Sequence, residues 1–382
     1  MTLAFDAKRL FANASGLGNY SRTLVGNLVA NYPEHRYTLF TPRIDAAYRR
    51  LAFVEPQGAN AASVATRHYA GPLGGLWRAF GIARELEPAG VDLYHGLSHE
   101  LPYGIHRTGV KSVVTIHDLI YQHFPEQFAW VDRRVFDWKF GYAIRHADHV
   151  VAITEHTRRD ILARYPEVAP ERVSVVYQSC DPLFFEQPAC ATDVTAKFYL
   201  PTEYVLSVGS IVERKNLEVV LKALAQLPPP ERLPLVAIGR GRVYRERLRE
   251  VARAHNVADY LHVVDTLADT TELIEVYRRA RAFVYPSRYE GFGIPVVESQ
   301  LCGTPVLAGD VPALREAGGE GAWYADPDDV PAWTQLLRRV LTDDAAAQRL
   351  AEAGRAQARA RFDGAVLSAE LHAVYERVLS GP

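Results

Sequence analysis

Short apolar runs alternate with helix-like segments along nearly the whole chain of 382 residues. Such alternation is typical of βαβ units, so it predicts an α/β protein with parallel sheets. The length exceeds what one ordinary core accommodates, and two domains are expected. The predicted strands are Leu3–Asp6, Arg36–Thr41, Leu93–His95, Lys111–His117 and His149–Thr154 in the first half, and Tyr204–Val208, Pro234–Ile238, Leu261–Val264, Ala282–Tyr285 and Pro305–Leu307 in the second.

The middle and the end of the chain have their own patterns. The stretch Asp181–Cys190 has no clear hydrophobic period, so we place the linker between the two halves there. From about Asp343 to Leu379 the chain is rich in Ala, Arg and Leu and is predicted to be helical, with Gly364 as a candidate break.

Composition indicates a soluble globular protein, with 48% hydrophobic and 23% charged residues. No apolar run approaches the roughly 20 residues of a membrane span. The first residues lack the pattern of a secretion signal, so we expect a cytoplasmic location. Cys180, Cys190 and Cys302 lack metal-like spacing and are expected as thiols, one disulfide being the alternative. A net charge of −2 gives no electrostatic basis for binding nucleic acid.

Two glutamates flank a glycine turn in the second half. Glu290 follows an apolar run that ends at Pro286, and Glu298 lies eight residues further on. Pro295 suits the start of a helix and Gly303 suits its end. This pattern predicts Glu290 at the carboxyl edge of a strand and Glu298 about one turn into the next helix.

The backbone N–H groups between these acids, at Gly293 and Ile294 above all, would form a helix N-terminus that suits a phosphate group. Carboxylates suit the hydroxyls of a sugar. A ligand with both groups, such as a nucleotide sugar, fits this layout.

Arg214 and Lys215 lie between a predicted strand and a predicted helix. Cations at a helix start oppose the helix dipole, which favours a functional role over a merely solvated position. There they would hold a diphosphate and stabilise it as it departs.

Three other strand ends carry candidate residues. Gly16 and Gly18 follow the first strand and precede a helix expected from about Tyr20; they would let a ligand approach the backbone, or simply form a tight turn. Gly239 follows a second-half strand and has the same two interpretations. His117 ends another apolar run, where it would contact a sugar hydroxyl or, alternatively, bond to a backbone carbonyl.

A catalytic metal is not predicted. The one Asp-x-Asp sequence, Asp326-Pro-Asp328, is interpreted as a loop and helix cap rather than a pair of ligands.

Together these motifs resemble glycosyltransferase family 4, retaining enzymes of GT-B fold, over nearly the whole chain. The strongest elements are Glu290-x7-Glu298 with the adjoining Gly-Phe-Gly-Ile-Pro and the later Cys302-Gly-Thr-Pro. The resemblance implies two Rossmann-like domains facing a central cleft, with a last helix that returns to the first domain. The expected ranges are 1–185 for the acceptor domain, 186–360 for the nucleotide-sugar domain and 361–382 for the returning helix.

The resemblance also implies residue roles. Glu290 would contact the donor sugar and Glu298 the ribose, and Lys215 with Arg214 would bind the diphosphate. The backbone at Gly293 and Ile294 would assist with the diphosphate, His117 would face the transferred sugar, and Gly16 and Gly18 would approach the phosphates. Many relatives carry arginine after the glycine that matches Gly209, whereas this chain has Ser210. Arg214 is expected to supply the second cation.

The implied reaction is transfer with retention and without a metal. The motifs look like those of bacterial mannosyltransferases of surface-polysaccharide assembly, which makes GDP-mannose the first candidate donor and a UDP-sugar the second. The expected acceptor is a saccharide or a polyprenyl-diphosphate-linked saccharide. A nucleotide-sugar epimerase and a non-catalytic nucleotide-sugar-binding protein remain alternatives. The aromatic and basic stretch Phe128–Phe140 would either pack in the core or touch the inner membrane peripherally.

Overall fold

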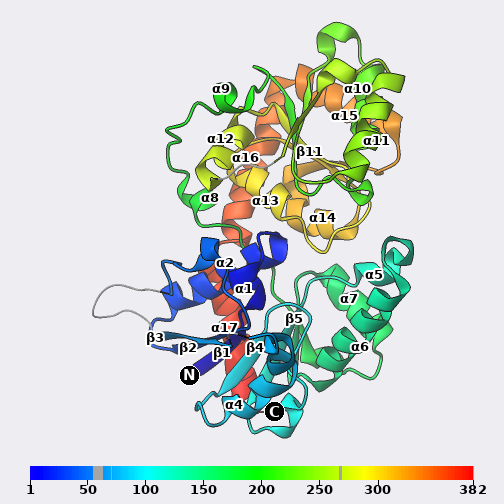
Figure 1. The fold of residues 1–382 in the computed structure, drawn as a ribbon. Helices are drawn as coiled ribbons and strands as arrows, with labels where there is room; N and C mark the ends of the chain where they lie inside the picture. Colours follow the sequence, from blue (N-terminus) through cyan, green and yellow to red (C-terminus); the bar gives the residue numbers. More distant parts are fainter. Residues whose placement is uncertain (55–62, 70, 266–268, 382) are drawn as a thin grey trace. The chain divides into compact units, whose positions relative to one another are not determined.

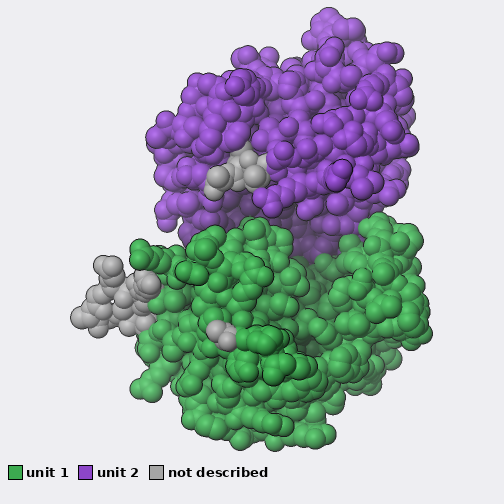
Figure 2. Space-filling model, viewed as in Figure 1, with its two compact units in different colours: residues 1–179, 364–382 green, residues 180–363 purple. Residues whose placement is uncertain are grey.

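The computed structural model describes residues 1–54, 63–69, 71–265 and 269–381. The chain forms two compact α/β units (Figures 1 and 2), which confirms the predicted class. Unit 1 comprises Met1–Ser179 and Gly364–Pro382, and unit 2 comprises Cys180–Asp363.

Unit 1 contains a parallel sheet in the order β3-β2-β1-β4-β5-β6-β7. This order places the first strand near the centre, as in Rossmann-like folds. Its strands are β1 Thr2–Asp6, β2 Arg36–Thr41, β3 Ser63–His68, β4 Leu93–Gly96, β5 Lys111–Ile116, β6 His149–Ala152 and β7 Val173–Val175. Its helices are α1 Lys8–Ala12, α2 Gly16–Asn31, α3 Gly74–Leu76, α4 Ile82–Leu86, α5 Ile120–His123, α6 Trp130–His146, α7 Glu155–Arg164 and α17 Gly364–Ser380.

Unit 2 contains a second parallel sheet in the order β10-β9-β8-β11-β12-β13. Its strands are β8 Val205–Val208, β9 Leu235–Ile238, β10 Leu261–Val264, β11 Ala282–Tyr285, β12 Val306–Gly309 and β13 Ala322–Ala325. Its helices are α8 Leu183–Glu186, α9 Val194–Phe198, α10 Leu217–Gln226, α11 Val243–Ala254, α12 Thr270–Arg279, α13 Ile294–Leu301, α14 Pro312–Gly318, α15 Val330–Thr342 and α16 Asp344–Arg361.

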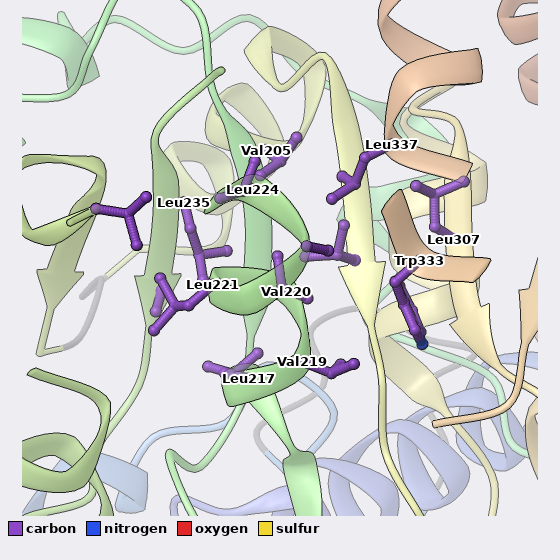
Figure 3. Close-up of a cluster of buried hydrophobic side chains, with 14 of the residues drawn as sticks. Val205, Leu217, Val219, Val220, Leu221, Leu224, Leu235, Leu307, Trp333 and Leu337 are labelled. Carbon is purple, nitrogen blue, oxygen red and sulfur yellow. The ribbon is translucent and has the colours of Figure 1, made fainter. Parts of the chain in front are cut away.

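The core of unit 2 shows why these segments adopt their conformations. Leu217, Val220 and Leu224 recur at helical spacing and are buried on one side of α10 (Figure 3). They belong to one buried cluster with β-branched and leucine side chains of the strands and with Trp333 of α15. A strand buried on both faces needs a continuous apolar run, which is the pattern of β8, β9, β11 and β12.

The last helix belongs to unit 1. Helix α16 ends at Arg361 and α17 begins at Gly364, the predicted break. Figure 1 shows α17 among the elements of unit 1, where it contacts α2 and β5. Tyr375 of α17 is buried, and its hydroxyl lies 2.6 Å from Nδ1 of His95 on β4. The predicted return of the last helix to the first domain is therefore present.

Unit limits differ by a few residues from the expected ranges 1–185, 186–360 and 361–382. The stretch Asp181–Cys190, predicted to be a linker, contains helix α8, which packs on α12 and α13 of unit 2. Phe184 of this helix is buried against Tyr277, with ring centroids 6.0 Å apart. The boundary between the units, at Ser179 and Cys180, lies next to this stretch, which itself packs as part of unit 2. A helix of four residues is too short to produce a detectable hydrophobic period.

Candidate functional site

The carboxyl edge of the sheet in unit 2 carries the predicted donor residues. Because all its strands are parallel, the loops that follow β8, β9 and β11 emerge at one edge. These loops carry Ser210 with Arg214 and Lys215, then Gly239, then Glu290. Open α/β sheets bind their ligands at this edge.

Two of these loops pack backbone against backbone. Gly239 has φ +153°, and a Cβ atom there would lie 1.8 Å from the carbonyl oxygen of Gly209. Gly209 itself has φ +133°. Next to them the amide of Ile211 donates to the carbonyl of Arg240 at 2.8 Å. Close packing of the loops therefore accounts for glycine at position 239 without a ligand, whereas Ser210 is exposed at the tip.

The Arg214-Lys215-Asn216 sequence forms a tight turn before α10. Glu213–Lys215 is a single 3-10 turn, and Asn216 follows in the left-handed region at φ +52°, which asparagine tolerates. The Asn216 amide donates to the carbonyl of Pro327 at 2.5 Å, and the backbone of Arg214 accepts from the amide of Arg288 at 3.0 Å. These bonds fix both cations beside the loop that carries Glu290.

Glu290 joins the two cations in one ion cluster. Its Oε1 lies 2.6 Å from Nζ of Lys215 and 2.8 Å from Nη1 of Arg214. Lys215 also lies over the Tyr285 ring, 4.1 Å from its centroid, and donates to the Tyr285 hydroxyl. The side chains of Lys215 and Glu290 are each only 11% exposed, so the cluster is largely shielded from water.

Burial and charge act in opposite directions on these groups. Burial lowers the pKa of Lys215 to about 8, although Glu290 and its hydrogen bond act to raise it. Burial would raise the pKa of Glu290, but Lys215 and Arg214 outweigh it and hold that pKa below its usual value. At neutral pH the cluster therefore carries two positive charges and one negative charge, and its net positive charge suits an anion. Pairing with both cations is a role of Glu290 that the sequence analysis did not assign.

Glu298 is the fifth residue of α13, about one turn into the helix, as predicted. Its Oε2 accepts a hydrogen bond of 2.9 Å from the hydroxyl of Tyr277. Burial raises the pKa of Glu298 to about 7, and the charge of Asp181 acts in the same direction. The carboxyl group is thus poised between a form that only accepts hydrogen bonds and a form that also donates, and both forms can bind a sugar hydroxyl.

The start of α13 has the geometry of an anion site. Gly293 caps the helix at φ +141°, and a Cβ atom there would lie 2.8 Å from Leu314 Cδ2, so only glycine fits. The first hydrogen-bonded amide of the helix is that of Val296, which donates to the carbonyl of Gly293 at 2.9 Å. The amides of Gly293 and Ile294 come before it, at the positive end of the helix dipole.

In unit 1, His117 directly follows β5 and is buried. Its Nε2 donates to the carbonyl of Leu97 at 2.9 Å, and its Nδ1 accepts from the side-chain amide of Gln178 at 3.0 Å. Burial lowers the pKa of His117 to about 4, so the ring is neutral. The backbone-bonded alternative from the sequence is thus the arrangement present in this structure.

Gly16 and Gly18 lie inside the first turn of α2, so the helix begins at Gly16 rather than near Tyr20. A Cβ atom on Gly18 would lie 1.9 Å from the carbonyl oxygen of Asn13, which explains this glycine by packing. A Cβ atom on Gly16 would meet nothing within 4 Å. Tyr20 from the same helix lies edge-on to His117, with ring centroids 4.5 Å apart, so the structure brings this helix start and His117 together.

Three residues that the sequence analysis missed support the predicted ones: Tyr285 lies under Lys215, Tyr277 binds Glu298 and Gln178 binds His117. Of these, only Tyr285 had a signal in the sequence, because it ends a predicted strand at the functional edge of the sheet.

The Asp326-Pro-Asp328 sequence lies in a turn, as predicted, but neither aspartate caps the helix. Asp329 caps α15 by accepting from the amide of Ala332, and Asp328 pairs with Arg288 at 2.6 Å. All three cysteines lie in the described part of the chain and remain unbridged thiols.

Solved structures of glycosyltransferases share this fold. HepE from Anabaena, crystallised with UDP and glucose, superposes with a TM-score of 0.73 at 17% sequence identity. The superposition covers 98% of this chain and 99% of HepE. A glycosyltransferase from Rickettsia africae matches 100% of this chain and 99% of its own with a TM-score of 0.76 at 16% identity. At these identities the likeness concerns the fold.

Sequence comparison defines the family. The model for Glycosyltransferase Family 4 matches residues 14–182, and the model for Glycosyl transferases group 1 matches residues 195–357. The two matches together account for most of both units. Each unit thus carries one of these two glycosyltransferase domains, and the protein is a glycosyltransferase, as its motifs predicted.

Curated relatives lie at moderate identity. O-antigen chain mannosyltransferase B from Escherichia coli is 28% identical over 270 residues, which is 70% of this chain and 70% of the relative. O-antigen chain mannosyltransferase RfbU from Salmonella typhimurium is 28% identical over 234 residues, 60% of this chain and 61% of the relative. A D-inositol 3-phosphate glycosyltransferase from Streptosporangium roseum is 33% identical over 248 residues, 61% of this chain and 55% of the relative.

Proposed function

We propose that the protein transfers mannose from GDP-mannose to a saccharide or polyprenyl-diphosphate-linked saccharide, with retention of configuration and without a metal. The observation that carries the proposal is the cluster of Arg214, Lys215 and Glu290 at the carboxyl edge of unit 2. Two fixed cations in a shielded site suit the charge that develops on a departing diphosphate. The start of α13 supplies oriented amides for the same purpose.

In this mechanism the bond between the sugar and the diphosphate breaks first, and the cations hold the leaving group. The acceptor hydroxyl then attacks the same face of the sugar and loses its proton to the departing phosphate. Glu298 would bind the ribose, as the family resemblance implies, and its carboxyl group lies about one turn after the start of α13. No described side chain is assigned the role of nucleophile.

Mannose is favoured because five of the curated relatives are named mannosyltransferases. A UDP-sugar is the second candidate, because HepE binds UDP and UDP-glucose. Calorimetric titration of the full chain with GDP-mannose, GDP, UDP-glucose and UDP would separate them. We expect tighter binding of the guanine nucleotides, and a preference for UDP would replace the proposed donor.

Turnover distinguishes the transferase from its alternatives. Incubation with donor alone would release an epimerised sugar nucleotide from an epimerase, whereas a transferase releases GDP and needs an acceptor for efficient turnover. A binding protein would do neither. Turnover that persists in excess chelator is expected, and loss of turnover restored by a divalent cation would reject the metal-free mechanism.

The acceptor side is supported by an exposed surface on α6. Trp130 and Trp138 are 62% and 57% exposed, whereas Phe140 of the same helix is buried. The stretch Phe128–Phe140 thus combines core packing with an exposed aromatic face. Trp138 stacks on Tyr103, which stacks on the exposed Phe80, with centroids 4.7 and 5.1 Å apart.

Cations lie beside this surface. Arg133, Arg134 and Arg164 line a hollow of about 370 Å³ next to Trp130. Exposed tryptophans beside arginines suit the interface of an anionic bilayer, where the headgroups meet the acyl chains. This arrangement supports peripheral membrane contact by unit 1. Within the described part of the chain, no helix has the length and apolar character needed to cross a bilayer.

Co-sedimentation with anionic liposomes tests this contact. The Trp130→Ala/Trp138→Ala double variant should lose binding, while Tyr199→Ser, which removes a ring that is 88% exposed on unit 2, should keep it. Equal binding of the double variant and the wild type would reject the proposed surface without affecting the donor assignment.

A further inference from the structure

Two histidines and an aspartate meet on unit 1. His123 is the last residue of α5, and His156 and Asp160 lie one turn apart on α7. One ligand atom of each side chain lies within 4.8 Å of the other two. Helix α5 follows β5 and helix α7 follows β6, so both helices start at the carboxyl edge of the sheet in unit 1.

The atoms are spaced as a metal requires. Oδ2 of Asp160 lies 2.8 Å from Nε2 of His123 and 3.7 Å from Nε2 of His156. Tetrahedral zinc with bonds of about 2.0–2.1 Å places neighbouring ligand atoms about 3.3 Å apart. The two distances to Asp160 lie on either side of that value, and all three ligand atoms lie within 4.8 Å of one another, so rotation of the side chains would bring them to it.

The local structure orients the ligands. Residues four apart lie on one face of a helix, which directs His156 and Asp160 to the same point. The Thr154 side chain caps α7 by accepting from the amide of Thr157, and the Thr157 hydroxyl donates to the carbonyl of His117 at 3.2 Å. The start of α7 is therefore tied to the end of β5, close to the origin of α5.

One oxygen of Asp160 faces both histidines. It lies 2.8 Å from Nε2 of His123, at hydrogen-bond distance, and 3.7 Å from Nε2 of His156. Two imidazoles directed at one carboxylate oxygen are the donor set that Zn²⁺ and similar divalent ions prefer.

We propose that His123, His156 and Asp160 form a binding site for a divalent transition-metal cation of the zinc type. The three side chains supply three ligands, and the partly exposed position of His123 leaves a further coordination position open to water or to a ligand oxygen. The bound ion joins α5 to α7. The site is independent of the metal-free transfer proposed for unit 2, since none of its ligands belongs to the ion cluster of Arg214, Lys215 and Glu290.

The test uses the full chain, freed of metal by a chelator and titrated with ZnCl₂ in a calorimeter. We expect one Zn²⁺ per chain in the wild type. Loss of a direct ligand should weaken binding at least about tenfold, because even loss of an outer hydrogen-bond partner costs about 10–100-fold. His156→Ala and Asp160→Asn are the variants, and His255→Ala, which removes an exposed histidine of unit 2, is the control that should bind like the wild type.

Titration with CoCl₂ gives a second measurement that does not depend on activity. The visible spectrum of bound Co²⁺ should indicate nitrogen ligands in the wild type and in His255→Ala, and this spectrum should be lost in His156→Ala. Circular dichroism identifies any variant that fails to fold, and Asp160→Asn keeps the shape of the side chain. Absence of stoichiometric binding in the wild type, or undiminished binding by folded Asp160→Asn, would overturn the proposal.

Discussion

Replacing Glu290 by glutamine tests the ion cluster directly. The two contacts of Glu290, at 2.6 and 2.8 Å, each correspond to about 6 kcal/mol of Coulomb attraction at an effective dielectric constant of about 20. Desolvation of the three groups offsets much of this attraction, and removing one member of a buried ion pair typically costs about 3–5 kcal/mol. Lys215, whose pKa is already about 8, can lose its proton and limit the damage. We therefore expect a loss of about 3 kcal/mol for Glu290→Gln.

Scanning calorimetry of the full chain would measure this loss in the unfolding transition of unit 2. For a domain of this size, about 3 kcal/mol corresponds to a decrease in Tm of about 6–12 °C. Glu231→Gln is the control, because Glu231 forms an exposed pair with Arg338 at 3.2 Å and should change stability by less than about 1 kcal/mol.

Two further measurements separate charge from packing. In the Glu290→Gln/Lys215→Met double variant one of the two unpaired cations is gone. The loss of stability should therefore be smaller than the sum of the two single losses by at least about 1 kcal/mol. Inorganic pyrophosphate should raise the Tm of Glu290→Gln more than that of the wild type, since it replaces the missing counter-ion. A decrease below about 1 kcal/mol for Glu290→Gln, or strict additivity in the double variant, would refute this account of the cluster.

Four other predictions concern the candidate site residues. Donor affinity should rise as pH increases through about 7, because ionised Glu298 accepts hydrogen bonds from sugar hydroxyls more strongly than the neutral carboxyl group does. It should fall above about 8, where Lys215 loses its proton, and a flat calorimetric profile would contradict both assignments. The raised pKa of Glu298 means that the neutral carboxyl group favours the folded state. This contribution to the free energy of unfolding, measured with denaturant, should be lost as pH rises from about 4.5 through 7. Tyr277→Phe removes a hydrogen bond that lowers the pKa of Glu298, so the acid limb of the affinity profile should move to higher pH, and an unmoved limb would show that the bond is unimportant. Gly239→Ala should lower the free energy of unfolding by about 2–4 kcal/mol, measured with denaturant, because the added Cβ would meet a carbonyl oxygen in a strained backbone. Gly16→Ala should change the free energy of unfolding by less than about 1 kcal/mol and lower only the turnover. The reverse order of the two losses would refute the packing argument.

Interior strands were predictable, whereas three of the four edge strands were not. The ten predicted strands are all present, including the edge strand β10, because each is built around apolar side chains. The missed strands, β3, β7 and β13, lie at the ends of the two sheets. Strand β3, with the sequence Ser-Val-Ala-Thr-Arg-His, is mostly exposed and therefore carries no apolar run. Sequence patterns report burial, so an edge strand with one polar face escapes them.

The residues of the candidate site were predictable where their location follows from their position after a strand. Glu290, Lys215 and Arg214 follow strands, and a parallel sheet necessarily brings such positions to one edge. Their mutual pairing was not predictable, because it depends on side-chain directions that loop packing sets. The same limit applies to Gly18 and Gly239, where sequence permits a ligand and the structure supplies a backbone carbonyl instead.

The return of α17 to unit 1 has a consequence for synthesis of the protein. Unit 2 is a single contiguous segment, whereas the core of unit 1 includes Leu371, Tyr375 and Val378 from the last helix. When residue 179 leaves the ribosome, His95 still lacks its partner Tyr375, and the groove that α17 fills is open to water. The first unit to begin translation is therefore the last to complete its fold, and a chain truncated before Gly364 would expose unfinished apolar surface to chaperones and proteases.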